Sequence, residues 1–462
     1  MSQSAVPPAQ QSVGVTGVSR QTHEFTLDGR LVHALAGESI LKAAQRHGVS
    51  IPHVCFKDGL RADGNCRACV VEISGERTLA PSCCRAVTPG MVVQTASERA
   101  QKSQRLVLEL LLSDLPEEAR THQATLHGEL GQWAERQAVA VRPELQALRR
   151  ESSTPQTGHA ATSARADSSH PAMDVRLDAC IQCTRCVRAC REVQVNGVIG
   201  MGWRGAQTQI VFDLADPMGA STCVGCGECV QACPTGALMP KALRAKQPAG
   251  ARVDKHVDSV CPFCGVGCLL TYEVKGNTLA GVQGRDGPAN QGRLCVKGRF
   301  GFDYVHHPHR LTQPLIRRND VPKDVNVLRD PSDWASVFRP ASWDEALDVA
   351  AGRLKGLRDT HGPKALAGFG SAKGSNEEAY LFQKLVRTGF GSNNVDHCTR
   401  LCHASSVAAL LEGVGSGAVS NQVNDVAQAD FVLVIGSNTA TNHPVAATWI
   451  KNAAQRGLKL VT

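Results

Sequence analysis

The spacing of hydrophobic and polar residues predicts a chain made of several small folded units. Residues 24–33 alternate as two short strands around an Asp28-Gly29 turn, and residues 38–46 follow as a helix. Leucines then recur at helical spacing through residues 101–150. The first part of the chain is therefore expected to hold a small sheet with one helix, followed by a helical segment.

The last third of the chain alternates between helical and strand patterns. Helices are predicted over residues 344–357 and 377–390, with a short apolar strand at residues 365–370 between them. Residues 430–436 form a continuous apolar run of the kind found in buried parallel strands, and a helix through Ala453 follows. This alternation predicts a doubly wound α/β domain.

Composition places the chain among soluble globular proteins, with 42% hydrophobic and 20% charged residues. The formal net charge of +8 is dispersed, whereas nucleic-acid binding needs a concentrated basic face, so no nucleic-acid partner is expected. No apolar run reaches membrane-spanning length, and residues 1–20 lack the apolar core and twin arginine of an export signal. A cytoplasmic protein without a membrane span is therefore expected.

The cysteines change this picture, because many of the 19 fall into Cys-x-x-Cys groups. In a long chain without an export signal, such groups indicate metal binding in a reducing compartment rather than disulfides. Four groups are separated along the chain, and each one predicts a site of its own.

The first group suits a [2Fe–2S] cluster. Its members have the spacing Cys-x10-Cys-x2-Cys-x13-Cys and are Cys55, Cys66, Cys69 and Cys83. Four thiolates on the loops of a small sheet are typical of such a cluster, although structural zinc sites use the same residue type. Cys84 follows Cys83 directly, so either of these two cysteines could be the fourth ligand.

The second group is a doubled Cys-x2-Cys-x2-Cys-x3-Cys run, the arrangement of two-cluster bacterial ferredoxins. In that arrangement the last cysteine of each run ligates the cluster of the other run. One [4Fe–4S] cluster is therefore assigned to Cys180, Cys183, Cys186 and Cys233. The other is assigned to Cys223, Cys226, Cys229 and Cys190. Two zinc sites built from the same cysteines are the alternative.

The third group has a different order, Cys-x2-Cys-x3-Cys and a distant Cys-x-Lys-Gly, and consists of Cys261, Cys264, Cys268 and Cys295. This order resembles the first domain of the molybdopterin oxidoreductases, whose [4Fe–4S] cluster lies beside a pterin. The resemblance implies that Lys297 bridges cluster and pterin, where a cation stabilises added electron density. The alternative is a lysine that faces solvent.

The fourth group contains Cys398 and Cys402, with His403 directly after Cys402. A thiol followed by an imidazole pairs a soft metal ligand with a group that titrates near neutral pH. Cys398 lies four residues before Cys402, so on a helix the two could share a face. It is interpreted either as a residue that supports the ligand Cys402 or as a structural cysteine.

A further candidate segment follows the apolar run at residues 430–436. Ligands of α/β sheets bind beyond the carboxyl ends of the strands. The residues that come directly after this strand are Gly436, Ser437, Asn438, His443 and Pro444.

Together these motifs resemble the catalytic subunit of the cytoplasmic, NAD-linked, molybdenum- or tungsten-dependent formate dehydrogenases, over residues 23–100 and 173–462. The resemblance implies that Cys402 ligates the metal beside two pterin dithiolenes, and that His403 borders the formate pocket. It also implies that the segment after residue 435 binds the nucleotide part of a guanine-dinucleotide pterin.

The reaction implied is the oxidation of formate to CO2. Electrons would pass through the Cys261 cluster, the two ferredoxin-like cubanes and the [2Fe–2S] cluster. Because the sequence shows no flavin or NAD motif, the acceptor implied is a separate flavin- and NAD-binding diaphorase subunit. The implied cofactors are one [2Fe–2S] cluster, three [4Fe–4S] clusters and a bis-molybdopterin guanine dinucleotide of molybdenum or tungsten.

The expected fold class is multidomain, α+β and α/β. A disordered tail is expected at residues 1–21, a helical segment at 101–150 and a linker at 151–172. The folded domains expected are a β-grasp [2Fe–2S] ferredoxin-like domain at 22–100, a bacterial two-[4Fe–4S] ferredoxin-like domain at 173–246, a [4Fe–4S] molybdopterin domain at 254–312, and an incomplete doubly wound pterin-binding domain at 340–462.

Other interpretations stay open. A non-catalytic electron-transfer subunit of a complex I-like or hydrogenase assembly would hold the same clusters without molybdenum. A related molybdopterin enzyme would act on another small oxyanion. The sequence stops at Thr462 inside an apolar strand, where family members continue. It is therefore expected to be the N-terminal part of a longer protein, or a truncated protein that is inactive alone.

Overall fold

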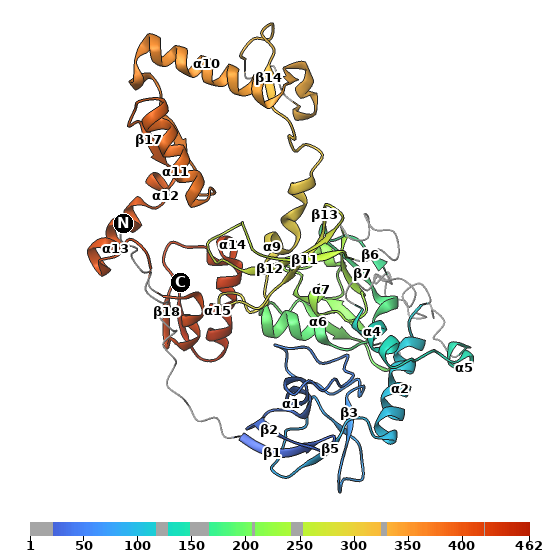
Figure 1. Cartoon of the computed structure of the whole chain (residues 1–462). Helices are drawn as coiled ribbons and strands as arrows, with labels where there is room; N and C mark the ends of the chain where they lie inside the picture. Colours follow the sequence, from blue (N-terminus) through green and yellow to red (C-terminus); the bar gives the residue numbers. More distant parts are fainter. Residues whose placement is uncertain are drawn as a thin grey trace, which may run out of the picture. The chain divides into compact units, whose positions relative to one another are not determined.

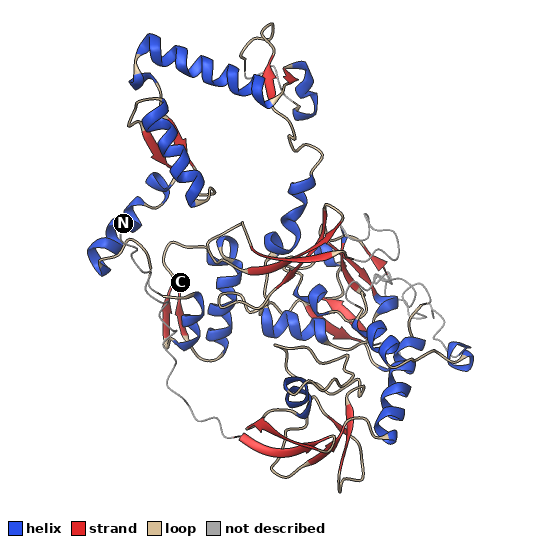
Figure 2. Ribbon diagram, viewed as in Figure 1, coloured by secondary structure: helices blue, strands red, loops and turns tan. Residues whose placement is uncertain are grey.

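The computed structural model describes residues 22–116, 128–147, 166–205, 208–241, 253–324, 330–419 and 421–462. The chain divides into two compact units, Met1–Phe302 with Val423–Thr462, and Asp303–Gln422 (Figure 1). Both units mix helices with short strands (Figure 2). Among the helices of the described ranges, none is long and apolar enough to cross a membrane. The tail predicted at residues 1–21 and most of the predicted linker, 151–165, lie outside the described residues.

The first folded part is a five-stranded mixed sheet with the order β2-β1-β5-β3-β4. Its strands are β1 (Thr22–Leu27), β2 (Arg30–Leu35), β3 (Val70–Ile73), β4 (Ala80–Pro81) and β5 (Val92–Gln94). The predicted hairpin is confirmed, because β1 and β2 pair antiparallel across Asp28 and Gly29. The predicted helix is α1 (Ile40–Arg46), and it begins after Ser39, whose hydroxyl caps it by accepting a hydrogen bond from Lys42 N. The buried face of α1 packs on the sheet in one apolar core.

The helical segment expected next is present as α2 (Glu98–Ser113), α4 (Glu129–Arg136) and α5 (Pro143–Ala147). Helix α2 is tied to the sheet by Gln104, whose amide donates to the carbonyl oxygens of Val70 and Thr95 at 2.9 and 3.1 Å. Leu108, on the buried face of α2, enters the core of the cysteine-rich part that follows. This segment therefore joins the first sheet to the next domain.

The next part carries the doubled cysteine run. A three-stranded sheet has the order β10-β7-β6, from β6 (Ala166–Asp167), β7 (Met173–Arg176) and β10 (Leu238–Pro240). A separate hairpin consists of β8 (Ile199–Gly202) and β9 (Gln209–Phe212). Two short helices carry the cysteines, α6 (Arg185–Arg188), continued by a π turn, and α7 (Glu228–Ala232). The two helices pack against each other, so they bring the two runs together (Figure 1).

The third part is an antiparallel sheet of β11 (Lys255–Val260), β12 (Leu269–Lys275) and β13 (Thr278–Gly284), followed by α9 (Val296–Phe300). The end of the chain returns to this part as β18 (Phe431–Leu433), α14 (Thr439–Asn442), α15 (Pro444–Gln455) and β19 (Lys459–Val461). Helix α15 is anchored through Trp449, whose indole N–H donates to Ala289 O at 2.8 Å. The Arg293 guanidinium lies 4.7 Å from the centre of the Trp449 rings.

The second unit holds the remaining elements. They are β14 (Leu315–Arg317), β15 (Phe338–Pro340), α10 (Trp343–His361), β16 (Gly368–Gly370), α11 (Asn376–Lys384), β17 (Val395–His397), α12 (Thr399–Cys402) and α13 (Ala404–Val414). Strands β16 and β17 pair in parallel, and the predicted helices at 344–357 and 377–390 correspond to α10 and to α11 with a following π turn.

The strand predicted at residues 430–436 is shorter and more exposed than expected. Strand β18 spans three residues and pairs only with β19, so the two parallel pairs are separate two-stranded sheets. Phe431 is 53% and Leu433 52% exposed. Parallel strands are normally covered on both faces. Because no second layer among the described residues covers this pair, its apolar side chains stay in contact with solvent.

Candidate functional site: four thiol groups and a strand-end segment

The first site gathers four thiols beside the mixed sheet. The Cys55 thiol lies close enough to those of Cys66 and Cys83 to interact with them, and the Cys83 thiol interacts in the same way with that of Cys69. These contacts lower the pKa of Cys55 to about 2, with Cys66 as the largest cause. A backbone donor also points at sulfur, because Cys55 N lies 3.4 Å from Cys66 Sγ. Four converging thiols with an N–H donor match the needs of a [2Fe–2S] cluster.

Cys83 and Cys84 differ in burial, although their Sγ atoms lie 3.6 Å apart. The Cys83 side chain is buried among the other three thiols, whereas Cys84 is exposed. A Cβ on Gly64 would lie 2.8 Å from Cys84 Sγ, which places that thiol against the Gly64 backbone. The geometry therefore favours Cys83 as the fourth ligand.

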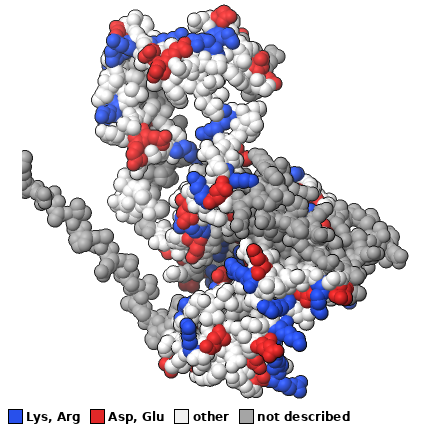
Figure 3. Space-filling model, turned by 45° about the vertical axis from the view of Figure 1, so that its right-hand side comes forward, with Lys and Arg blue, Asp and Glu red and all other residues white. Residues whose placement is uncertain are grey.

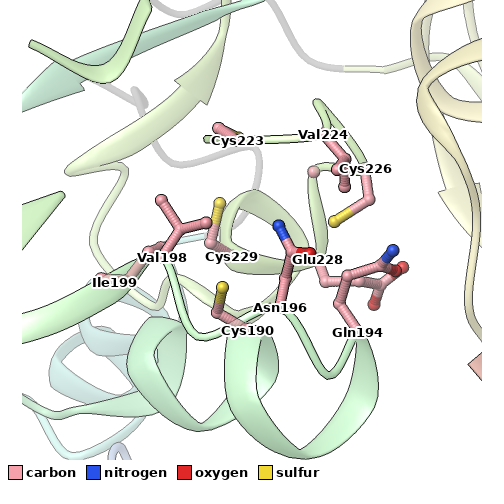
Figure 4. A pocket seen from close by; sticks show the side chains of 11 residues that line it. Cys190, Gln194, Asn196, Val198, Ile199, Cys223, Val224, Cys226, Glu228 and Cys229 are labelled. Carbon is pink, nitrogen blue, oxygen red and sulfur yellow. The ribbon is translucent and has the colours of Figure 1, made fainter. Parts of the chain in front are cut away.

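The second site is a cavity between the two cysteine runs. Cys190 from the first run lines it together with Cys223, Cys226 and Cys229 from the second run. Figure 4 shows the sulfur atoms of Cys190, Cys226 and Cys229 directed into the same space. This is the crossed set that the spacing predicts for one cubane, and its donor chemistry suits iron.

The complementary set consists of three cysteines of the first run and Cys233. Burial and, second, the charge of the Cys233 thiolate raise the pKa of Cys183 to about 12. The same two causes act on Cys180, whose pKa is raised to about 11. Cys186 is buried and feels the charges of Cys183, Cys180 and Cys233. Cys233 therefore lies with the first run, as the second cubane requires.

The two runs repeat a backbone geometry as well as a spacing. Gln182 N lies 3.4 Å from Cys180 Sγ, and Gly225 N lies 3.4 Å from Cys223 Sγ. Gln182 and Gly225 both have positive φ, 56° and 66°. A non-glycine residue with positive φ is uncommon, and this backbone conformation costs energy. Residues in such conformations cluster at functional sites. Each loop is therefore shaped to aim an N–H group at a sulfur atom.

The third site lies at the junction of the three-stranded sheet and α9. Cys261 and Cys268 flank a loop whose ends are joined by a 2.9 Å hydrogen bond from Cys261 N to Cys268 O, and Cys295 caps α9. The pKa of Cys268 is raised to about 12, first by burial and then by the charges of Cys261, Cys264 and Cys295. Lys297 is exposed, and its positive charge acts on the Cys261 thiol. The four thiols thus share one site with a cation at its edge.

The zinc alternative requires a tighter group of ligands. Thiolates around one Zn²⁺ ion at 2.3 Å lie less than about 4 Å from one another. In the described part of the chain, no three His, Cys, Asp or Glu side chains are placed to hold a single metal ion. The cysteine spacings along the sequence, by contrast, are those of iron–sulfur motifs.

Cys402 and His403 lie in the second unit, beyond the carboxyl end of β17. Both are exposed, with Cys402 ending α12 and His403 preceding α13. Cys398 has a structural contact, because its Sγ accepts a hydrogen bond from Ala372 N at 3.1 Å. The loops after β16 and β17 meet at this edge, which is where parallel sheets bind ligands.

The strand-end segment after β18 has the same character. Gly436 adopts a φ of 60°, and the Asn438 side chain caps α14 by accepting from Thr441 N at 3.2 Å. His443 precedes α15, and Pro444 occupies its first turn. Free N–H groups at the start of a helix favour anionic groups, so this exposed edge can accept phosphates.

Buried arginines inside the cysteine groups were not predicted. Their side chains are 0 to 5% exposed, and they are Arg185, Arg188 and Arg299. The available signal is that each is a charged residue within a cysteine motif, one to four residues from the nearest cysteine.

Comparison with known families assigns each of these regions. Residues 20–98 match a 2Fe-2S iron-sulfur cluster binding domain, and residues 179–237 match a 4Fe-4S dicluster domain. Residues 254–307 match the molybdopterin oxidoreductase Fe4S4 domain, and residues 310–462 match the molybdopterin oxidoreductase family itself.

Similar proteins occur in Bacillus subtilis. YjgC, whose name marks it as a probable oxidoreductase, is 31% identical over 95% of this chain and 45% of the relative. YrhE, named as a candidate formate dehydrogenase, is 30% identical over 94% of this chain and 46% of the relative. The chain thus spans about half the length of these curated relatives. A crystal structure of an NAD⁺-reducing [NiFe]-hydrogenase aligns with 49% of this chain and 90% of that one, at 26% identity and a TM-score of 0.42.

Proposed function

Because the chain belongs to the molybdopterin oxidoreductase family and carries iron–sulfur domains, we propose that it forms the N-terminal part of a formate dehydrogenase. The observation that carries the proposal is the Cys402-His403 pair beyond β17, at the carboxyl edge of a parallel strand pair in the molybdopterin oxidoreductase region. Relatives that align with 93% and 94% of this chain are named as candidate formate dehydrogenases.

The proposed reaction converts HCOO⁻ to CO2, with release of one proton and two electrons. A bis-pterin molybdenum or tungsten group, when bound, accepts those two electrons. Cys402 would hold the metal as a soft thiolate ligand. His403 would orient formate or hold the released proton on an imidazole nitrogen, because imidazole changes its protonation near neutral pH.

The remaining residues in the proposal bind the pterin and conduct electrons. Lys297 would lie between cluster and pterin, and the nucleotide part would bind at Gly436, Ser437, Asn438, His443 and Pro444, where α14 and α15 begin. Electrons would leave one at a time through the clusters to a flavin- and NAD-binding partner subunit. All 19 cysteines are free, as a reducing compartment such as the cytoplasm would keep them.

Metal analysis of the holo-protein tests this function. We expect about 14 iron atoms per chain, two in the [2Fe–2S] cluster and four in each cubane, together with one molybdenum or tungsten. Cys402→Ser should lose the molybdenum or tungsten and formate oxidation while it keeps its iron. Cys398→Ser is the matched control, and it should keep both kinds of metal. A wild-type protein with full iron but no molybdenum or tungsten would instead indicate an electron-transfer subunit. Turnover of nitrate rather than formate would show that formate is not the substrate.

A further inference from the structure

One buried arginine connects the first thiol group to the second. Arg188 Nη2 donates to Cys55 O at 2.6 Å and to Cys183 O at 3.2 Å. Its Nη1 donates to the Arg61 carbonyl oxygen, and its Nε lies 3.1 Å from Asp63 Oδ2. The Arg188 side chain is 5% exposed. A single guanidinium therefore touches a cysteine of the [2Fe–2S] site and a cysteine of the first cubane site.

A second buried arginine makes the equivalent connection at the other end of the dicluster part. Helix α9 begins directly after Cys295. Arg299 is the fourth residue after that cysteine, and its backbone N–H donates to Cys295 O at 3.0 Å. Its side chain crosses to α7, where Nε donates to Cys226 O at 2.7 Å and Nη2 to Glu228 Oε1 at 2.7 Å. Arg299 thus joins the second cubane site to the Cys261 site.

We propose that Arg188 and Arg299 are positioning residues that link neighbouring clusters and order them in one line. The order runs from the [2Fe–2S] site through the Cys180 cubane and the Cys223 cubane to the Cys261 cubane. The proposal rests on the cluster assignments of the proposed function. At each link one electron leaves a reduced cluster and enters its oxidised neighbour, so no bond changes and no further oxidant is consumed.

Arginine suits this role for two reasons. Its guanidinium has five N–H donors and stays protonated at all physiological pH values, so it can hold two carbonyl groups at a fixed separation and keep its charge. Burial of that charge is compensated by hydrogen bonds and by Asp63 or Glu228. A retained positive charge within about 10 Å of a cluster favours the reduced form, on the order of tenfold in its population at fixed potential.

The test is a redox titration of the holo-protein, followed by the electron paramagnetic resonance signals of the separate clusters. R188Q should lower the reduced population of the [2Fe–2S] cluster and the Cys180 cubane about tenfold at fixed potential, or 59 mV per electron. R299Q should do the same for the Cys223 and Cys261 cubanes and leave the [2Fe–2S] signal in place. R77Q, which removes an exposed arginine of the first domain, is the control and should shift none of them.

Iron content distinguishes a failure of the proposed role of the arginines from a failure of the cluster assignments. If R188Q and R299Q both keep full iron and unchanged reduction potentials, the proposed role of the arginines is wrong while the cluster assignments stand. If wild-type protein shows none of the cluster signals, the cluster assignments themselves are wrong. If the glutamine variants lose iron, D63N and E228Q decide, because they keep each arginine and remove its counter-charge. Both should raise the potential of the adjacent clusters, and unchanged potentials in both would reject the proposal. R188K and R299K should restore the charge effect, but they should slow electron transfer between the linked clusters.

Discussion

Gly227 and Arg299 lie so close that a Cβ on Gly227 would sit 2.2 Å from Arg299 Cδ. Gly227 has a φ of 71° and precedes α7, so the loop turns sharply where the guanidinium of Arg299 crosses to Cys226 O. The absence of a side chain at this position is what admits the arginine. The junction between the dicluster part and the Fe4S4 domain therefore depends on a glycine as much as on charge.

Substitution of that glycine is expected to separate the two domains. G227A should destabilise the holo-protein by about 1–3 kcal/mol more than G197A, because the added methyl group forces Arg299 out of its place. Gly197 is the control, since its φ of 70° is similar and nothing lies within 4 Å of its Cβ position. Denaturant unfolding of both variants gives the difference, and equal losses of stability would show that only backbone strain matters.

The fourth ligand of the [2Fe–2S] site can be decided by two serine variants. C83S should lose about two iron atoms per chain and the [2Fe–2S] signal, because the Cys83 thiol contacts those of Cys55 and Cys69. C84S should retain both, because Cys84 is exposed. Iron analysis and electron paramagnetic resonance are the measurements. If C84S loses the iron and C83S keeps it, Cys84 is the fourth ligand.

Arg185 provides a stability test that involves no cluster ligand. Its side chain is fully buried and makes hydrogen bonds of 2.6 and 2.7 Å to the two carboxylate oxygens of Glu129. E129A should reduce the free energy of unfolding by about 3 kcal/mol, because it leaves a buried charge without its partner. E135A, an exposed change in the same helix, should cost less than about 0.5 kcal/mol. Similar costs for the two variants would contradict the buried-charge explanation.

His170 should make stability depend on pH. Burial lowers its pKa, the charge of Asp167 partly opposes this, and a smaller effect of Lys241 lowers the pKa further. Its Nδ1 accepts a hydrogen bond from Ala172 N at 3.1 Å. The unfolded chain, with a pKa near about 6.5, then gains its proton first as the pH falls. Stability is therefore complete above that pH and declines as the pH falls below it.

In H170N the asparagine side chain can still accept the hydrogen bond from Ala172 N, but it does not titrate. Denaturant unfolding at about pH 5 and pH 8 should show a smaller difference for H170N than for wild type. H256N, which changes an exposed histidine, should leave the difference unchanged. An H170N protein with the full wild-type pH dependence would remove His170 as its source.

The cysteine sites could be predicted because their spacing follows from cluster geometry, which is local and independent of the rest of the fold. The placement of Cys190 with Cys223, Cys226 and Cys229 is one such case. The buried arginines could not be predicted, because the carbonyl of Cys55 that receives Arg188 is distant in sequence. Only the packing of α6 against the first domain brings the two together.

Burial of strands was also less predictable than their positions. The run at residues 430–436 is apolar enough for a covered parallel strand, yet β18 exposes Phe431 and Leu433. Hydrophobicity indicates what a strand can bury, whereas exposure depends on which layers are present. The sequence also predicts that charged residues are dispersed. On the face seen in Figure 3, Lys and Arg side chains are interspersed with Asp and Glu side chains.

The placement of Cys190 among the second-run cysteines has a consequence for repair. In the crossed assignment each cubane takes three cysteines from one run and one from the other, so neither cubane has all four ligands while one half of the dicluster part is unfolded. Loss of one cubane would free a cysteine of the run that holds most ligands of the other. We therefore expect reassembly of either cubane to require that both halves are folded together.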